Sequence, residues 1–353
     1  MSHQTKITNG NGDEPNESIT TSKQAANNND KIGNLVFNVM TSFVILGSTY
    51  LYYYMPDYLQ QLYEKYPDYK FPEYNDFLIA FAFIPLFVVL REITNKCTKK
   101  LATEMIGKKF KDPSDLENFN VGKVYIKKQS CNFYKVVFYI FNVIFGYIVL
   151  KDLNYFPVYF GGSGEFKNIY ANGKIDMTFY KPPLFTVYYM FYLSHNLTDM
   201  IYLLFIYEQQ TDFPLMFLHH TCTISLIFFS HFTNLSHIGA IVMFLHDIAD
   251  IVVYYMRSII NTDCGEFQKV SGGIILLLIY IYTRLFVFGK LIYSCYEDHL
   301  SNMMFQTLWY FMCFLYVIHS YWLLQIVKKI YNGMFKREFD DTASFKKQIK
   351  NVD

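Results

Sequence analysis

The residues with the clearest capacity for chemistry are two adjacent histidines, His219 and His220, and a second group at His246, Asp247 and Asp250. Both groups lie inside apolar runs, "DFPLMFLHHTCTISLIFFSHF" and "VMFLHDIAD". Ionisable side chains are costly in lipid unless they pair or line a wet cavity, so such residues indicate a functional site. A carboxylate can orient an imidazole, which then accepts a proton from a nucleophile or carries an acyl group.

Two metal or hydrolytic chemistries fit these residues poorly. A di-iron membrane oxygenase needs a larger set of histidines in HxxxH and HxxHH boxes, and no histidine stands three or four residues before His219. A serine hydrolase needs its nucleophile at a strand-to-helix elbow, and "GGSGE" at 161–165 is a plain glycine loop. We therefore predict no metal site. A set that only holds helices together, or relays protons in a transporter, stays open, although a transporter should show internal repeats or broken helices.

The elements that must position these residues are membrane-spanning helices. The 353 residues are 52% hydrophobic and 20% aromatic but only 17% charged, which is more apolar than a soluble domain. The six cysteines include no close pair and so predict neither a disulfide framework nor a zinc site. We predict an all-α polytopic membrane protein with about eight transmembrane helices, at Asn34–Tyr54, Asp76–Glu92, Phe133–Leu150, Leu184–Tyr207, Leu215–Phe232, Ile238–Tyr255, Gly273–Ile292 and Thr307–Val327.

The second span is short and holds Pro85, so a count of seven stays open. The first 33 residues are polar and predict a disordered tail with no cleavable signal peptide, so the first span would act as the internal targeting signal.

Loop charges orient the spans, because Lys and Arg stay preferentially on the cytosolic side. The segment 91–128 carries ten of them, and the segment 328–337 carries four. With eight spans, both segments are cytosolic only if the N-terminus is cytosolic and the segments 55–76 and 293–306 are lumenal. The predicted lumenal segments agree, since the first is net acidic and the second has no Lys or Arg.

This topology predicts that the two groups of ionisable residues meet. His219 and His220 lie four and five residues into their span, which is about 6–8 Å at 1.5 Å per residue. Asp250 lies five residues from the cytosolic end of the next span. Only a few residues join the two spans, so they should be antiparallel neighbours, and the groups should converge on one pocket in the cytosolic half.

The residues around this pocket resemble a known family. Their pattern is similar, at matching spacing, to the longevity-assurance (Lag) motif of ceramide synthases in the TLC-domain superfamily. The resemblance rests on Asp212, Phe213, His219, His220, Thr223, Ser230, Asn234, Gly239, Leu245, His246, Asp247 and Asp250. "KKQSCNFYKVVFYIF", "YTRLFVF" and "VIHSYWLLQIVKKI" resemble further segments of the same family, so the resemblance covers about 127 to 332.

The chain departs from the family at several positions. Ceramide synthases generally have arginine at the position of His237, glutamate at Tyr254, serines at Ile248 and Ala249, and lysine at Arg257. The last change keeps the charge, whereas Tyr254 removes an acid one turn from Asp250.

The resemblance implies N-acylation of a sphingoid base such as sphinganine by a long-chain fatty acyl-CoA, which gives ceramide or dihydroceramide. It implies catalytic roles for His219, His220, Asp247 and Asp250. Residues expected to bind substrate are His246, Asn234, Arg257 and Arg284. In this hypothesis the aspartates orient and charge-balance the imidazoles. Either His219 is acylated, or it acts with His220 as a base on the amine.

The resemblance also implies a domain organisation. A polar tail at 1–33 precedes two transmembrane helices and a basic cytosolic loop at 34–126. A TLC domain at 127–335 holds the motif at 212–257, and a charged tail follows at 336–353.

The expected partners are fatty acyl-CoA as co-substrate, the sphingoid base, membrane lipids and a second subunit in a homo- or heterodimer. No cofactor and no nucleic acid are expected, and the expected location is the endoplasmic reticulum membrane. The alternative function is a non-catalytic TLC-domain membrane protein that acts in lipid sensing or transport, although such proteins often lack the paired histidines and the downstream HD-x-x-D.

Overall fold

The computed structural model describes residues 17–171, 174–205, 213–296 and 302–336. The chain divides into two compact units, Met1–Phe43 and Val44–Asp353. The first holds the beginning of helix α1, and the second holds every residue of the candidate site that is described below.

Helices account for most of the described residues. The α-helices are α1 (Glu17–Lys65), α2 (Asp76–Met105), α3 (Leu116–Leu150), α4 (Phe185–Phe205), α5 (Phe213–Phe232), α6 (Ser236–Ile259), α7 (Glu266–Tyr280), α8 (Phe288–Ser294) and α10 (Met303–Lys336). A π-helix, η4 (Ile281–Val287), joins α7 to α8 without a break. Two-residue strands β1 (Tyr170–Ala171) and β2 (Lys174–Ile175) pair antiparallel between α3 and α4.

The predicted fold class, an all-α polytopic membrane protein, is confirmed. In the described part of the chain, six helical segments are long and apolar enough to cross a membrane: α2, α3 from Gly122, α5, α6, the continuous segment Glu266–Ser294, and α10. Helix α4 is 21 residues long but carries Ser194, His195, Asn196 and Asp199, which lower its hydropathy. These four side chains are buried, so α4 turns polar groups toward its neighbours rather than toward lipid.

The helices extend beyond the predicted spans at several ends. Helix α2 continues through Pro85 as far as Met105, and its most apolar window has a mean hydropathy of 2.1, so the span that looked weakest is strongly apolar. Helix α1 begins at Glu17 and therefore enters the segment predicted to be a disordered tail. No proline or glycine stands between Glu17 and Ile32 to stop a helix that continues from the apolar segment.

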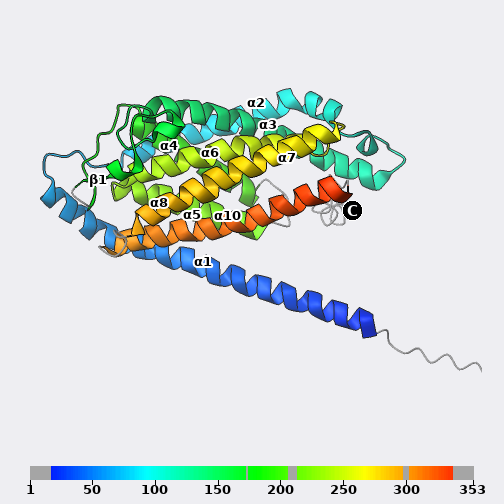
Figure 1. The fold of residues 1–353 in the computed structure, drawn as a ribbon, viewed down its shortest axis with the longest axis horizontal. Helices are drawn as coiled ribbons and strands as arrows, with labels where there is room; N and C mark the ends of the chain where they lie inside the picture. Colours follow the sequence, from blue (N-terminus) through cyan, green and yellow to red (C-terminus); the bar gives the residue numbers. More distant parts are fainter. Residues whose placement is uncertain (1–16, 172–173, 206–212, 297–301, 337–353) are drawn as a thin grey trace, which may run out of the picture. The chain divides into compact units, whose positions relative to one another are not determined.

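Helix α3 runs alongside α6, although more than one hundred residues separate their facing side chains (Figure 1). Gln129 donates a hydrogen bond to the Ser258 carbonyl at 2.8 Å, and Asn142 donates to the Asp247 carboxylate near the middle of α6. Helices α5 and α6 are joined by a tight turn in which Asn234 has a positive φ of 57°. The α5–α6 pair carries the motif, and α3 packs against the α6 member of this pair.

Candidate active site in the helix bundle

Three histidines from three helices form a cluster, which we call the histidine cluster: His219 of α5, His246 of α6 and His319 of α10. The ring of His319 lies with its centroid 4.8 Å from that of His246 and 5.8 Å from that of His219. His319 is fully buried, and His246 is 6% exposed. His220 lies beside the cluster, with its ring centroid 5.6 Å from that of His219.

Arg284 connects this cluster to an acidic residue. One of its terminal nitrogens lies 2.6 Å from Oδ1 of Asp250 and 3.2 Å from the carbonyl oxygen of His246. The other lies 3.0 Å from Nε2 of His319. Arg284 stands in the π-helix η4, a wider turn that often marks a functional position. Asp250 is therefore the charge partner of Arg284.

Asp247 has a different environment, although it lies one turn from Asp250. It is fully buried and accepts a hydrogen bond from Asn142 of α3. Its other oxygen, Oδ1, has no hydrogen-bond partner in the described part of the chain. Within those residues, neither aspartate makes a hydrogen bond or ion pair with His219 or His220. The aspartates thus contact an amide and a guanidinium rather than the motif imidazoles.

The structure does not bring all of the predicted substrate-binding residues together. Asn234 lies in the α5–α6 turn, 12 residues and so about 18 Å along the helix from His246. It accepts a hydrogen bond from Lys181 at 2.5 Å and donates one to the Met177 carbonyl, so it fastens the segment before α4 to this turn. Burial lowers the pKa of Lys181 to about 8.

Arg257 also lies apart from the histidine cluster, near the end of α6. Its side chain is exposed, and its guanidinium carbon lies 5.4 Å from the centroid of the Tyr254 ring. Asp250 lies nine residues before Ile259, the last residue of α6, rather than five, because the helix extends past the predicted span. The ionisable residues of α6 therefore lie deeper in that helix than the sequence predicts.

A second group of buried charges lies where α2, α3 and α4 meet. The Asp199 carboxylate is shared by two cations, Arg91, which it contacts closely, and Lys135 at 2.8 Å. His195 lies one turn away on α4 with Nε2 at 3.8 Å from Asp199, and its ring is stacked on Phe138. We call these four polar residues the α2–α4 charge cluster.

Several of these residues were not predicted from the sequence. His319 and Asn142 lie in segments remote from the motif, and only their polarity within apolar runs could have identified them. Arg91 was counted as a basic loop residue, yet it is fully buried. His195 and Asp199 stand four residues apart on α4, which is a helical signal that the sequence does contain.

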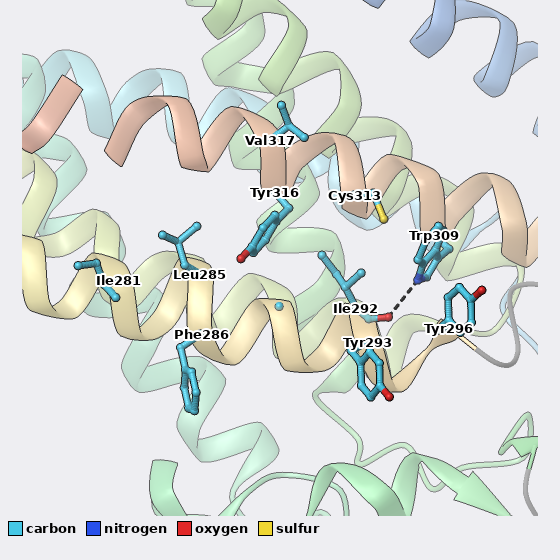
Figure 2. Close-up of a pocket in the computed structure, with 11 residues that line it drawn as sticks. Ile281, Leu285, Phe286, Ile292, Tyr293, Tyr296, Trp309, Cys313, Tyr316 and Val317 are labelled. Atoms are coloured by element: carbon cyan, nitrogen blue, oxygen red, sulfur yellow. Dashed lines mark hydrogen bonds between the residues drawn. The ribbon is translucent and has the colours of Figure 1, made fainter. Parts of the chain in front are cut away.

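An apolar groove lies between the η4–α8 segment and α10 (Figure 2). Its volume is about 740 Å³, and its walls include Ile281, Leu285, Gly289, Trp309 and Tyr316. At one end the Trp309 indole donates a hydrogen bond to the Ile292 carbonyl at 3.0 Å, as Figure 2 shows. The ring of Phe288 lies 6.4 Å from that of Tyr316, which lines the groove, and 5.1 Å from that of His246. One aromatic side chain therefore stands between the groove and the histidine cluster.

No metal site emerges from the described ranges, in which no three His, Cys, Asp or Glu residues are grouped so that they could hold an ion. The unpaired polar atoms of the histidine cluster are ring nitrogens. Nδ1 of His219, Nε2 of His246 and Nδ1 of His319 are buried without a hydrogen-bond partner among the same residues. The arrangement offers acceptors and donors for proton transfer or acyl transfer.

Comparison with known proteins identifies the family. The TLC domain family model matches residues 129–328, more than half of the chain. Ceramide synthase 4 of Homo sapiens is 28% identical over 167 residues, which cover 45% of this chain and 41% of the human protein. Ceramide synthase 1 LOH3 of Arabidopsis thaliana is 24% identical over 308 residues, which cover 79% of this chain and 91% of the plant protein.

The match to the mammalian relatives thus spans less than half of their length, as it also does for ceramide synthase 4 of Bos taurus, at 45%. The plant relative matches over most of both chains. Three observations indicate the same family. Several helical segments could cross a membrane, the motif residues His219 and His246 lie in the histidine cluster, and the family model matches the part of the chain that holds them. This multi-pass membrane protein belongs to the TLC-domain family, and it is similar to relatives that are named ceramide synthases.

Proposed function

We propose that the protein is a ceramide synthase, an acyltransferase that N-acylates a sphingoid base with a long-chain fatty acyl-CoA. The products are ceramide or dihydroceramide and free CoA, and the proposed location is the endoplasmic reticulum membrane. The convergence of His219 and His246 with the Arg284–Asp250 ion pair, inside apolar helices, is the observation that supports this proposal most. The relatives named ceramide synthase support it independently.

The proposed reaction has two acyl transfers. A ring nitrogen of His219 attacks the thioester carbonyl, the C–S bond breaks, and the CoA thiolate leaves with the proton that the imidazole loses. The amine of the sphingoid base then attacks the acyl-imidazole, the bond between the acyl carbon and the His219 nitrogen breaks, and an amide forms. The proton that the amine loses passes through His246 to the departing imidazole, so both histidines are restored. The second route, in which His219 and His220 act only as bases on the amine, needs the same residues and stays open.

His246 suits a role as proton acceptor in either route. Its Nδ1 donates a hydrogen bond to the Val242 carbonyl at 2.6 Å, so a neutral ring keeps its lone pair on Nε2. Nε2 is buried and unpaired within the described residues. His246 can therefore take the proton that the amine loses.

The aspartates have different proposed roles from those in the sequence-based hypothesis. Asp250 acts through Arg284, whose charge it balances and whose position it fixes. Asp247 holds α6 against α3 through Asn142, and Tyr192 of α4 also interacts with its carboxyl group. Both residues remain essential in this proposal, because Asp250 fixes Arg284 beside His319 and Asp247 fixes the part of α6 that carries His246.

The hydrocarbon chain of a substrate would need an apolar path beside the histidines. The groove between η4–α8 and α10 supports this requirement, since its volume lies in the range of about 300–1,000 Å³ that ligand sites occupy. Membrane lipids are the proposed surroundings of this groove, and homo- or heterodimers remain an expectation. No cofactor takes part in the proposed reaction.

A direct assay tests the proposal. Purified full-length protein in micelles is incubated with sphinganine and a panel of acyl-CoAs, and N-acyl products are measured by mass spectrometry. Alanine at His219 or His220 should reduce product more than about 100-fold, as loss of an essential acid, base or nucleophile does, while the protein still accumulates in membranes. Alanine at Asp247 or Asp250 should reduce product to a similar extent, because Asp250 holds Arg284 in place and Asp247 holds α6 against α3. Tyr255→Phe is the matched control, because Tyr255 lies on α6 with half of its side chain exposed.

The same assay separates the alternatives. Absence of N-acyl product for every chain length would overturn the proposal and favour a non-catalytic TLC-domain protein in lipid sensing or transport. Wild-type product levels in the double variant His219→Ala/His220→Ala would contradict the mechanism.

A further inference from the structure

His319 is the member of the histidine cluster that lies outside the motif. It stands near the middle of α10 and is fully buried. Its ring is surrounded by those of His219, His246, Phe288 and Trp322, with centroids 4.8 to 5.9 Å away. Two of these neighbours are the histidines to which the proposed reaction assigns chemistry.

Arg284 determines which nitrogen of His319 carries the proton. A guanidinium donates hydrogen bonds and cannot accept them, so the contact of 3.0 Å between Arg284 and Nε2 of His319 requires Nε2 to accept. A neutral imidazole that accepts at Nε2 carries its proton on Nδ1. Asp250 and the carbonyl oxygen of His246 hold Arg284 in place from the other side.

The Nδ1–H group of His319 is then a buried donor without an acceptor among the described side chains and backbone groups. Buried donors are nearly always paired in folded proteins, so an unpaired one beside a candidate site indicates a group that pairs with a ligand. A substrate carbonyl oxygen next to His219 would supply the acceptor.

We propose that His319 is a catalytic residue whose Nδ1–H donates a hydrogen bond to the carbonyl oxygen of the acyl group. This inference rests on the proposed acyltransferase function. When His219 attacks, the carbonyl π electrons move to the oxygen, and the hydrogen bond stabilises the resulting oxyanion until the CoA thiolate leaves. The same bond stabilises the second oxyanion when the amine attacks. His319 keeps its proton throughout, and Arg284 is the positioning residue that fixes its orientation.

Two substitutions distinguish this role from packing. In His319→Asn an amide nitrogen stands near the position of Nδ1, so a donor is retained. In His319→Gln the amide group stands near the position of Nε2. Its oxygen can still accept a hydrogen bond from Arg284, but no N–H group stands at the position of Nδ1. Tyr321→Phe is the control, because Tyr321 lies on the same helix with half of its side chain exposed.

The measurements are kcat and KM for N-acylation of sphinganine, and the affinity of full-length protein for a thioether analogue of acyl-CoA. Loss of one oxyanion donor typically costs about 10²–10³ in kcat. We expect His319→Gln to lose this much, His319→Asn to stay within about tenfold of wild type, and both to bind the analogue with affinity within about threefold. Tyr321→Phe should match the wild type.

The outcomes are distinguishable from a failure of the proposed function. If the wild type forms no N-acyl product, the function itself is wrong. If the wild type is active but His319→Gln keeps its kcat, or if the two variants lose activity equally, His319 is not the oxyanion donor. A loss confined to KM or to analogue binding would also overturn the inference, because it would indicate ground-state binding or packing.

Discussion

At the scale of single residues, the two buried aspartates that form ion pairs, Asp250 and Asp199, differ in the number of cations that they contact. Asp250 contacts one cation, Arg284, whereas Asp199 is shared by Arg91 and Lys135. Removing one partner from a buried ion pair leaves an uncompensated charge in a low-dielectric interior. We expect Asp199→Asn to lower the free energy of unfolding by about 3–5 kcal/mol, measured by chemical denaturation in micelles.

The control for this prediction is Glu64→Gln, which removes an exposed carboxylate that accepts a hydrogen bond only one turn away on its own helix, from Gln60. Substitutions at such surface positions usually change stability by less than about 0.5 kcal/mol. Equal losses in the two variants would mean that the shared carboxylate contributes no more than a surface charge.

The residues of the candidate site differ in how well the sequence predicts them. His219 and His246 could be placed near each other, because a short turn forces α5 and α6 to be antiparallel and the helical rise sets depth. The partners of Asp247 and Asp250 could not, because Asn142 and Arg284 reach them from helices whose rotation and register depend on packing along their whole length. His319 was missed for the same reason.

At the scale of helices, the contact between α4 and α6 depends on a glycine. A Cβ atom at Gly239 would overlap the hydroxyl of Tyr189, which forms a 2.6 Å hydrogen bond with Ser230 of α5. Three helices thus meet at one point with no room for a methyl group. We expect Gly239→Ala to destabilise the protein by about 1–3 kcal/mol, the usual cost of overpacking, measured as above.

Gly265→Ala is the matched substitution, since a Cβ at Gly265 would meet no heavy atom within 4 Å. Its stability should stay near that of the wild type. If the two alanine variants are equally stable, α4 and α6 do not depend on close approach at Gly239.

At this scale, the positions of the helices along the chain were the most predictable property. The surroundings of each helix were the least predictable. Apolar runs of sufficient length predicted the helices, and within the described residues the helices cover the predicted spans, except that α4 begins at Phe185 rather than Leu184. In the described part of the chain, six of the eight predicted spans lie in segments long and apolar enough to cross a membrane. Composition could not show that α4 turns its polar side chains inward, because the α2–α4 charge cluster also needs Arg91 and Lys135 from other helices. Asp212, the first residue of the motif, lies outside the described residues.

At the scale of the whole molecule, the orientation in the membrane can be tested with a native thiol. Cys97 is the exposed one of the six cysteines and lies in the basic segment 91–128, which is predicted to be cytosolic. In sealed microsomes from the endoplasmic reticulum the cytosolic face is outermost. We therefore expect a membrane-impermeant maleimide to label Cys97 without detergent, measured by a mass shift on gels.

The variant Cys97→Ser/Lys167→Cys provides the opposite case. Lys167 is exposed between α3 and α4, and α3 is long and apolar enough to cross the membrane once between the two sites. Its replacement should be labelled only after permeabilisation. Equal labelling at both positions would contradict a membrane crossing by α3. A reversed pattern would contradict the proposed function as well, because the entry to α5 and the histidines beyond it would then face the lumen, where acyl-CoA made in the cytosol does not arrive.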